Sequence, residues 1–270
     1  MEINEKIVGF LSEVKKMKPL VHNITNYVTT NDCANIILAI GGSPVMADAI
    51  EEVEDMVNIA SALVINIGTL NSRTVEAMIL AGKRANKNGI PVVLDPVGVG
   101  ATPYRKEVAL KLIKEINFSI IRGNMAEIKV LSGLEALSKG VDSEESSEDG
   151  KEVAINLSRA LKTVVAITGV IDFISNGEKV IAIENGHEML TKVTGTGCMS
   201  TCLIGVYAGV TKDYLAAATA GIMTMGIAGE KAYEKLNKSE GNGSFKVLLM
   251  DNIYNFSSQD IIKRGKANEL

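Results

Sequence analysis

Short runs of β-branched and other apolar residues alternate along this chain with longer segments of helical periodicity. Uninterrupted apolar runs separated by helices are typical of strands that are buried on both faces of a parallel sheet. The alternation therefore predicts an α/β fold with a mostly parallel central sheet and helices on both faces. The expected strands are Leu20–Ile24, 62–67, 91–94, 118–121 and 163–168, and the expected helices between them are 32–39, 71–88, 104–116 and 124–131.

The pattern changes after the last of these strands. Segments Asp172–Ser175 and 179–183 flank an Asn-Gly turn and predict a β-hairpin, while the last third, rich in Ala, Gly and Met, predicts helices. The acidic, Ser-containing stretch 139–151 predicts a solvated surface loop before a helix at 153–161. Because the sequence shows no internal repeat, linker or low-complexity tail, we expect residues 1–270 to form a single domain.

Composition and charge disfavour several classes of protein. A net charge of −4 and an aromatic content of 4% argue against a surface for nucleic acid. No apolar run reaches the roughly 18 residues of a membrane span, and the charged N-terminus does not resemble a signal peptide. The cysteines Cys33, Cys198 and Cys202 have no paired spacing, which disfavours structural zinc or a disulfide framework. We therefore expect a cytoplasmic protein with reduced thiols that binds neither nucleic acid nor a membrane.

A glycine-rich turn precedes the helical last third, and its residues are Gly195, Thr196, Gly197 and Cys198. Two glycines allow a tight turn, and the N-terminus of the following helix directs free N–H groups and a positive dipole end into it. The turn is therefore predicted to be an anion hole for a phosphate or for developing negative charge. A purely structural turn is the alternative that this motif leaves open.

Two carboxylates stand where strands are expected to end. Asp95 closes one strand, and Glu127 follows Asn124 by three residues at the start of a helix. Carboxylate and amide oxygens that converge at strand ends predict a Mg²⁺ site, since Mg²⁺ takes few protein oxygens together with water and phosphate. The alternatives are a turn residue at Asp95 and a capping box at Asn124 and Glu127, the latter worth about 1 kcal/mol.

The order of these motifs resembles that of the ribokinase-like kinases: a strand-ending Asp-Pro-Val, then Asn-x-x-Glu, then Gly-x-Gly before a helix. In that superfamily an Asp usually follows the Gly-x-Gly turn, whereas this chain has Cys198. Within the superfamily, several segments look like those of hydroxyethylthiazole kinases. They are residues 20–26, 42–47, 66–70, 95–103 and 192–198.

The resemblance implies a single ribokinase-like domain that phosphorylates the hydroxyethyl group of 4-methyl-5-(2-hydroxyethyl)thiazole with ATP and Mg²⁺, in thiamine salvage. By position, it implies thiazole binding by Asn26, Met46 and Gly195, ATP binding by Arg122 and Thr168, and Mg²⁺ binding by Asp95 and Glu127. It also implies a homotrimer with substrate sites at the subunit interfaces. The chemistry agrees, because an Arg can hold a phosphate through two parallel hydrogen bonds and a strand-end Thr can donate a third.

Cys198 occupies the position of the catalytic Asp. An unperturbed thiol has a pKa near 8.5, and a helix N-terminus lowers the pKa of a cysteine. We therefore expect Cys198 to be partly thiolate near neutral pH and to accept the proton of the alcohol. The alternative is a small packing residue at the start of the helix.

Other functions are left open by the residues themselves. Cys198 with His22 or His187 as base would make a cysteine hydrolase, and the same fold could serve a non-catalytic nucleotide-binding regulator. Among kinases, a hydroxymethylpyrimidine kinase shares the glycine-rich turn. A structural role is expected for His22, none is assigned to His187, and Cys33 and Cys202 are expected to be thiols of the core.

Overall fold

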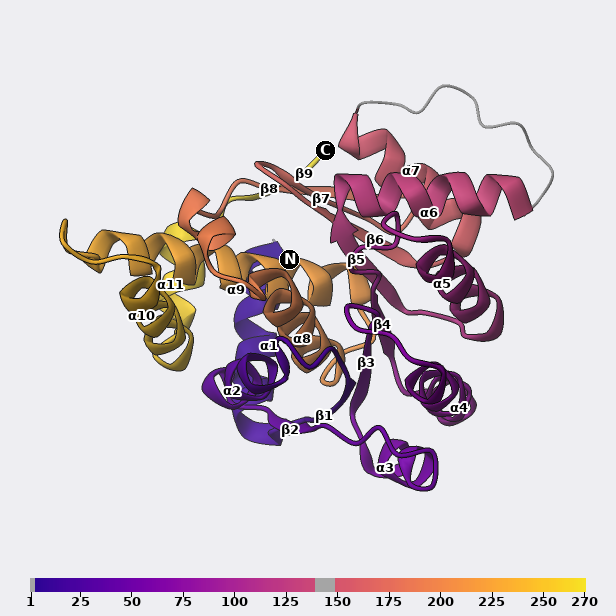
Figure 1. Cartoon of the computed structure of the whole chain (residues 1–270). Helices are drawn as coiled ribbons and strands as arrows, with labels where there is room; N and C mark the ends of the chain where they lie inside the picture. Colours follow the sequence, from indigo (N-terminus) through magenta and orange to yellow (C-terminus); the bar gives the residue numbers. More distant parts are fainter. Residues whose placement is uncertain (1–2, 139–148) are drawn as a thin grey trace.

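The computed structural model describes residues 3–138 and 149–270 and shows one continuous sheet between two layers of helices (Figure 1). The strand order is β2-β1-β3-β4-β5-β6-β7-β8-β9, parallel from β2 to β6 and antiparallel beyond. The strands are β1 (Leu20–Ile24), β2 (Ser43–Val45), β3 (Ala62–Asn66), β4 (Val92–Asp95), β5 (Ile120–Asn124), β6 (Val164–Thr168), β7 (Asp172–Ser175), β8 (Val180–Ile183) and β9 (Ala267–Glu269). The predicted mostly parallel sheet and the predicted hairpin are therefore confirmed.

Helices cover both faces of the sheet, as predicted (Figure 1). One layer holds α1 (Ile3–Met17), α2 (Thr30–Ile40), α8 (Thr196–Ala208), α9 (Tyr214–Lys235), α10 (Asn242–Tyr254) and α11 (Ser258–Arg264). The other holds α3 (Val53–Ile59), α4 (Ser72–Asn88), α5 (Pro103–Glu115), α6 (Met125–Ser138) and α7 (Gly150–Leu161). A 3-10 turn, η1 (Glu188–Lys192), precedes α8. Within residues 3–138 and 149–270, none of the helices combines the length and apolarity that a bilayer crossing requires.

The central strands β3 and β4 are apolar up to their polar carboxyl-terminal residues because both of their faces are covered. In β3, Val64 packs into the core under α8, whereas Leu63 and Ile65 pack into the core under α4. Successive side chains of a strand point to opposite faces. A strand that is buried on both faces therefore shows a continuous apolar run, and the runs in the sequence reflect this burial.

The sequence pattern missed α1, α3 and the two edge strands. β2 and β9 are three residues long, and β2 contains a proline, so neither carries the apolar run that marks a strand. β5 extends to Asn124, beyond the expected end at residue 121, because polar site residues occupy its carboxyl end. Most of the surface loop predicted at 139–151 lies outside the described residues, and α7 begins at Gly150.

Two glycines seat α8 tightly between the sheet and α9. A Cβ atom at Gly205 would lie 2.6 Å from Cγ2 of Val64 in β3, and one at Gly221 would lie 2.6 Å from the backbone nitrogen of Ile204. No side chain larger than hydrogen fits at either contact. Because α8 lies this close to the sheet, its N-terminus is held at the carboxyl ends of the parallel strands.

We expect Gly221→Ala to lower the free energy of unfolding by about 1–3 kcal/mol, because the new methyl group would meet backbone atoms that cannot turn aside. Gly9→Ala is the matched control, since Gly9 is an exposed glycine in α1 whose Cβ would meet nothing within 4 Å. That variant should gain up to about 1 kcal/mol from helix propensity. Urea denaturation of both variants measures the difference, and an equal gain at both positions would contradict the packing argument.

Candidate active site

Polar side chains gather at the carboxyl ends of four neighbouring parallel strands, opposite the N-terminus of α8. They are Asn66 at the end of β3, Asp95 at the end of β4, Arg122 in β5 and Thr168 at the end of β6, with Asn26 just after β1. The strand order places all of them along one edge of the sheet. Ligands of open α/β sheets bind at this edge, so the structure brings four of the predicted site residues together and adds Asn66.

Asn66 lies at the centre of the site, and it was not predicted. Its amide oxygen accepts hydrogen bonds from the backbone nitrogen of Gly68 and from Nδ2 of Asn26, both at 2.9 Å. Because a backbone N–H can only donate, the oxygen must face Gly68, which fixes the orientation of the amide. Nδ2 of Asn66 then donates to Oδ2 of Asp95 at 2.9 Å and to Sγ of Cys198 at 3.3 Å. Asn66 is buried, and every hydrogen-bonding group of its side chain has a partner.

Cys198 receives a second amide. Nδ2 of Asn26 donates to Sγ of Cys198 at 3.4 Å, while Oδ1 of Asn26 accepts hydrogen bonds from the backbone and hydroxyl of Thr29, both at 3.1 Å. The predicted residues Asn26 and Cys198 are thus in contact. Two N–H groups donate to this one sulfur, so they would stabilise negative charge on it.

The pKa expected for Cys198 was wrong in direction. Burial raises the pKa of this thiol above its usual value, and the negative charge of Asp95 raises it further, against hydrogen bonds with Thr29 and Asn66 that lower it. Burial removes the water that would stabilise a thiolate, and this outweighs the helix N-terminus. Cys198 is therefore mainly a thiol at neutral pH, with a smaller thiolate fraction than was expected.

In the described part of the chain, neither His22 nor His187 has a recorded contact with the thiol of Cys198. Nε2 of His22 is 2.7 Å from the carbonyl oxygen of Ala47, and the ring of His187 stacks on Tyr233. Burial lowers the pKa of His22, so this ring is a neutral structural group, as predicted. A cysteine hydrolase needs a base beside its nucleophile, and this arrangement does not support one.

Asp95 is buried at the end of β4 with one oxygen bound and one free. Oδ2 accepts hydrogen bonds from Nδ2 of Asn66 at 2.9 Å and from Oγ1 of Thr201 at 2.8 Å. Oδ1 is buried with no hydrogen-bond partner in the described part of the chain. Burial raises the pKa of Asp95 to about 6, although the charge of Arg122 and the bond from Thr201 oppose the rise. A buried carboxylate oxygen without a donor is a suitable ligand for a cation.

Glu127 forms the capping box that the sequence left open as an alternative. Its Oε2 accepts a hydrogen bond from the backbone nitrogen of Asn124 at 2.8 Å, and Oδ1 of Asn124 accepts one from the backbone nitrogen of Glu127 at 2.9 Å. Oε1 of Glu127 also accepts a hydrogen bond from the backbone nitrogen of Gly98 at 2.9 Å. Glu127 therefore holds the turn after Asp95 against the start of α6. Within the described residues, no three His, Cys, Asp or Glu side chains form a metal cage.

Arg122 and Thr168, predicted together as ATP-binding residues, are in contact. Nη2 of Arg122 donates to Oγ1 of Thr168 at 2.6 Å, and Nε of Arg122 is buried with no partner in the described part of the chain. A Cβ atom at Gly197 would lie 2.6 Å from Nη1 of Arg122, so a side chain there would displace the guanidinium from beside α8. The first hydrogen bond of α8 runs from Met199 N to Gly195 O at 2.8 Å. The N–H groups of residues 196–198 precede it and lie at the positive end of the helix.

The two glycines of the turn are required for different reasons. Gly195 has a φ of +86°, which other residues rarely adopt, and a Cβ there would also lie 2.5 Å from Cγ2 of Thr29. Gly197 has no unusual φ, and its missing side chain leaves room for the guanidinium of Arg122 in its present position. The methyl-bearing Thr196 stands between them, and its hydroxyl donates to the carbonyl oxygen of Leu190 at 2.9 Å, which ties η1 to the start of α8.

A pocket of about 690 Å³ opens beside the guanidinium of Arg122. Its wall includes Thr168 and Gly197, the turn after β6, the segment before α8 and part of α9. The volume lies within the usual range for small-molecule sites. Asp172 also lines it, and burial raises the pKa of Asp172 to about 6, against the hydrogen bond from Gly169 and the charge of Arg122.

Met46 lies away from the contacts described so far. It follows β2, which is the outer neighbour of β1, and its side chain is partly buried against the core. The strand order therefore places Met46 on the same edge of the sheet as Asn26. The carbonyl oxygen of Ala47, held by His22, fixes the segment that carries Met46.

Three residues that organise the site escaped the sequence analysis. Besides Asn66, they are Thr201, which binds Asp95, and Arg105. The guanidinium of Arg105 donates to the carbonyl oxygens of Ile67, Val97 and Gly68, and so ties the turns after β3 and β4 together. Helical spacing gave a signal for Thr201, because it follows Cys198 by three residues and shares its face. Arg105 gave none, since a helix-start arginine is ordinarily solvated.

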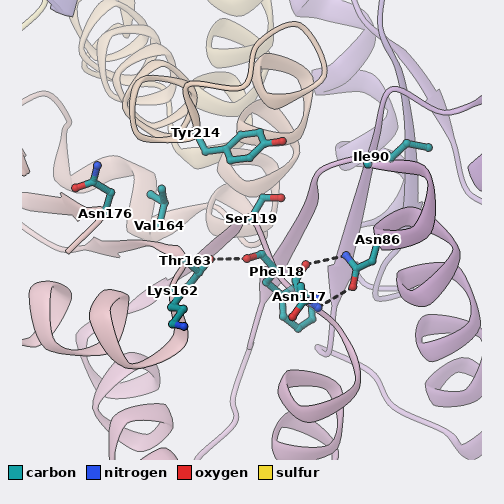
Figure 2. A pocket seen from close by; sticks show the side chains of 11 residues that line it. Asn86, Ile90, Asn117, Phe118, Ser119, Lys162, Thr163, Val164, Asn176 and Tyr214 are labelled. Atoms are coloured by element: carbon teal, nitrogen blue, oxygen red, sulfur yellow. Dashed lines mark hydrogen bonds between the residues drawn. The ribbon is translucent and has the colours of Figure 1, made fainter. Parts of the chain in front are cut away.

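A second hollow, of about 420 Å³, is lined by residues such as Asn86, Asn117 and Thr163 (Figure 2). Its polar groups bind one another: Nδ2 of Asn86 donates to the carbonyl oxygen of Asn117 at 2.8 Å, and the backbone nitrogen of Asn117 donates back to Oδ1 of Asn86 at 2.7 Å. Oγ1 of Thr163 donates to the carbonyl oxygen of Phe118 at 2.7 Å. These bonds join loops at the amino ends of the strands, away from the site.

Relatives of this chain share its full length. The sequence profile of the hydroxyethylthiazole kinase family matches residues 11–259. The chain is 57% identical over 271 residues to a hydroxyethylthiazole kinase of Alkaliphilus oremlandii, with 100% of both chains covered. It is 53% identical over 274 residues to a hydroxyethylthiazole kinase of Clostridium beijerinckii, with 100% of this chain and 99% of the other covered.

Solved structures agree with the fold. The structure of a hydroxyethylthiazole kinase protein from Pyrococcus horikoshii matches with a TM-score of 0.90 at 42% identity and covers 98% of this chain and 99% of its own. A pyridoxal kinase from Staphylococcus aureus matches with a TM-score of 0.65 at 18% identity, covering 94% of this chain and 98% of its own. The second likeness concerns the fold alone. The predicted resemblance and the predicted ribokinase-like architecture are confirmed.

The buried carboxylate of Asp172 should make stability depend on pH. Its pKa of about 6 in the folded protein lies above the value near 3.9 of an unfolded chain, so the folded state holds the proton more tightly. This contribution to stability is complete below pH 4 and is lost as the pH rises to about 6. Asp172→Asn keeps the oxygen that accepts the hydrogen bond from Gly169 and removes the charge.

We expect Asp172→Asn to raise the free energy of unfolding at pH 8 by roughly 2 kcal/mol and to have little effect at pH 4. Urea denaturation at both pH values measures the gain. Asp251→Asn, which removes an exposed carboxylate of α10, is the matched control and should show no such difference. A gain at Asp172 that is equal at both pH values would contradict the role of burial.

Proposed function

The chain belongs to the hydroxyethylthiazole kinase family, and on that premise we propose that it transfers the γ-phosphoryl group of ATP to the hydroxyl of 4-methyl-5-(2-hydroxyethyl)thiazole. This reaction is a salvage step towards thiamine. The observation that carries the proposal is that the thiol of Cys198, in the first turn of α8, lies against the amide of Asn66, while Arg122 lies beside Gly197 of the same turn. An alcohol at the thiol and a phosphate at the guanidinium would meet across a helix N-terminus.

Arg122, Thr168 and the turn at 195–198 form the phosphate side of the proposed site. Phosphoryl transfer has a loose transition state whose charge spreads over the phosphoryl oxygens, so catalysis depends on positioning and on positive charge. Arg122 supplies a positive charge whose position is fixed by the hydrogen bond to Thr168. The N–H group of its buried Nε is free to donate to a phosphate oxygen. The N–H groups that precede the helical ladder of α8 supply further donors where negative charge develops.

Asn26, Met46 and Gly195 form the proposed thiazole side. Asn26 is supported by its contact with Cys198, which places the hydroxyl end of the substrate near the turn. Gly195 is supported by its left-handed conformation at the start of α8, which favours glycine. Because glycine has no side chain, a substrate could approach the backbone there. Met46 is supported by its place on the same edge of the sheet and by its flexible, polarizable side chain, which suits an aromatic sulfur heterocycle.

Mg²⁺ fits one of the two carboxylates better than the other. Asp95 offers Oδ1, a buried oxygen without a donor, whereas both oxygens of Glu127 already accept backbone hydrogen bonds. We assign Asp95 and Glu127 as the groups that would hold the ion, directly or through water. When bound, Mg²⁺ would neutralise phosphate charge. Asn66 and Thr201 hold Oδ2 of Asp95 and so leave its other oxygen for this purpose.

Cys198 is proposed as the group that takes the proton of the alcohol. The oxygen of the hydroxyl bonds to the γ-phosphorus, the bond from that phosphorus to the β–γ bridging oxygen breaks, and the hydroxyl proton passes to the thiolate of Cys198. The raised pKa leaves only a small thiolate fraction at neutral pH. A late proton transfer tolerates so small a population of the base, and the amides of Asn26 and Asn66 stabilise the thiolate that does form.

A homotrimer with substrate sites at its interfaces is proposed for the assembly. The side chains of Tyr27 and Val28, which follow Asn26, are 82% and 58% exposed. Large apolar side chains beside a proposed substrate residue are suited to contact with a second subunit. A cytoplasmic location is proposed as well, because ATP is the donor and the thiols of Cys33, Cys198 and Cys202 are free.

Release of ADP should require both the thiazole alcohol and Mg²⁺. We expect ADP formation with ATP, Mg²⁺ and hydroxyethylthiazole, and a rate near background when either the alcohol or the metal is omitted. A coupled assay with a panel of small alcohols, including hydroxymethylpyrimidine, measures the preference. Equal ADP release with and without an alcohol would mean an ATPase or a regulator, and a preference for the pyrimidine would identify the other kinase.

Substitution of Cys198 should change the dependence of turnover on pH. Wild-type kcat should rise with pH above neutrality as the thiolate forms, because burial has raised the pKa of the thiol. Cys198→Asp should retain or exceed wild-type activity at pH 7 and rise less steeply, since a carboxylate is already ionised. Cys198→Ala and Cys198→Ser should both slow turnover and leave the KM for ATP nearly unchanged. Full kcat in the Ser and Ala variants at every pH would make Cys198 a spacer.

The trimer is tested by mass in solution. We expect light scattering to give three times the 28.7 kDa of the chain. Tyr27→Asp should lower that mass, because a charge cannot be buried cheaply at an interface. A monomeric mass for the wild-type protein under assay conditions would contradict the proposal.

A further inference from the structure

The pocket beside Arg122 has a basic end at that guanidinium, carboxyl groups at Asp172 and Glu188, and a stretch of apolar wall. Leu190, Ile222 and Met225 line that wall, and His187 is the aromatic ring among its lining residues. If the phosphates of a nucleotide lie at Arg122, the base must lie along the rest of the wall. An apolar wall with one aromatic ring suits a flat heteroaromatic base better than it suits a sugar or a phosphate.

The ring of His187 is held in place on its far side. It stacks on Tyr233 of α9 with ring centroids 3.6 Å apart and planes inclined by 20°. Its Nδ1 accepts a hydrogen bond from the backbone nitrogen of Met189 at 3.2 Å, and because that nitrogen can only donate, the hydrogen of the neutral ring lies on Nε2. One face of the ring is thus occupied, and the residue lines the pocket.

The segment before His187 is anchored too. Nδ2 of Asn185 donates to the carbonyl oxygen of Arg264 at 2.8 Å and to Oε1 of Glu230 at 3.1 Å. The same carboxylate oxygen accepts a hydrogen bond from the backbone nitrogen of Gly186 at 3.1 Å. These bonds fix the backbone that carries the ring of His187. Binding of a ligand to this ring therefore costs little free energy for ordering the residue.

We propose that His187 is the base-binding residue of the nucleotide pocket, where the purine ring of the triphosphate stacks on the face of the imidazole opposite Tyr233. The inference rests on the proposed kinase function, because the phosphates at Arg122 place the base. Stacking of a base on an aromatic side chain needs no hydrogen-bond pattern, since every base has a π face. His187 therefore acts on nucleotide affinity and not on the chemical step.

Two substitutions separate the aromatic face of His187 from its capping role. His187→Asn keeps an acceptor for the backbone nitrogen of Met189, which is the cap, and removes the aromatic face. His187→Phe keeps a face that can stack and removes the acceptor. We expect His187→Asn to raise the KM for ATP about tenfold, and His187→Phe to stay within about twofold of the wild type. In both variants kcat and the KM for the alcohol should be unchanged.

Tripolyphosphate, which has the phosphates of ATP without its base, is the second probe. Its inhibition constant against ATP should be the same in the wild type and in His187→Asn. A wild-type KM for ATP in His187→Asn would overturn the proposal, and so would a KM in His187→Phe that rises as much as in His187→Asn. Equal weakening of ATP and tripolyphosphate would also overturn it, because the phosphate end would then have been disturbed.

The same assay keeps this inference apart from the proposed function. If the wild-type protein releases no ADP in response to the alcohol, the proposed function is wrong. If the wild-type protein is active and His187→Asn binds ATP as tightly as the wild type does, the function stands and the role of His187 is wrong.

Discussion

The buried amide of Asn66 is the interaction on which the site depends. It accepts hydrogen bonds from the chain that follows β1 and from its own turn, and it donates to Asp95 of β4 and to Cys198 of α8. One planar group thereby sets the relative positions of three strand ends and a helix. Because all its donors and acceptors are used, any rotation would leave buried polar groups unpaired, at about 1–3 kcal/mol each. The amide is therefore rigid without being a reacting group.

The site is built at a cost to stability. Asp95 and Asp172 are both buried carboxylates whose pKa burial raises to about 6. Near neutral pH each is ionised in a place that would favour the neutral acid, and Asp95 also keeps one oxygen without a donor. Such groups destabilise the empty protein. A cation or a charged ligand that supplies what is missing would bind more tightly for the same reason.

Burial also explains why the thiol differs from its expected state. A helix N-terminus attracts negative charge, but only within its first turn and with a modest free energy. Cys198 lies under Asn26 and Asn66, close to the charge of Asp95, so the loss of water outweighs the dipole. In the proposed reaction, the same enclosure would keep water away from the hydroxyl, at the cost of a small thiolate fraction at neutral pH.

By itself the sequence determined the layers of the fold and the edge of the sheet where polar side chains gather. Apolar runs such as 62–67 follow from burial on both faces, and polar residues such as Asp95 and Thr168 end strands at the edge where open α/β sheets bind ligands. Only the tertiary structure decided which of these residues touch. Asn66 and Arg105 owe their roles to neighbours distant in the chain, and the protonation of Cys198 depends on burial. Local patterns record periodicity and capping, whereas contacts and solvation arise only when separate strands and helices pack together.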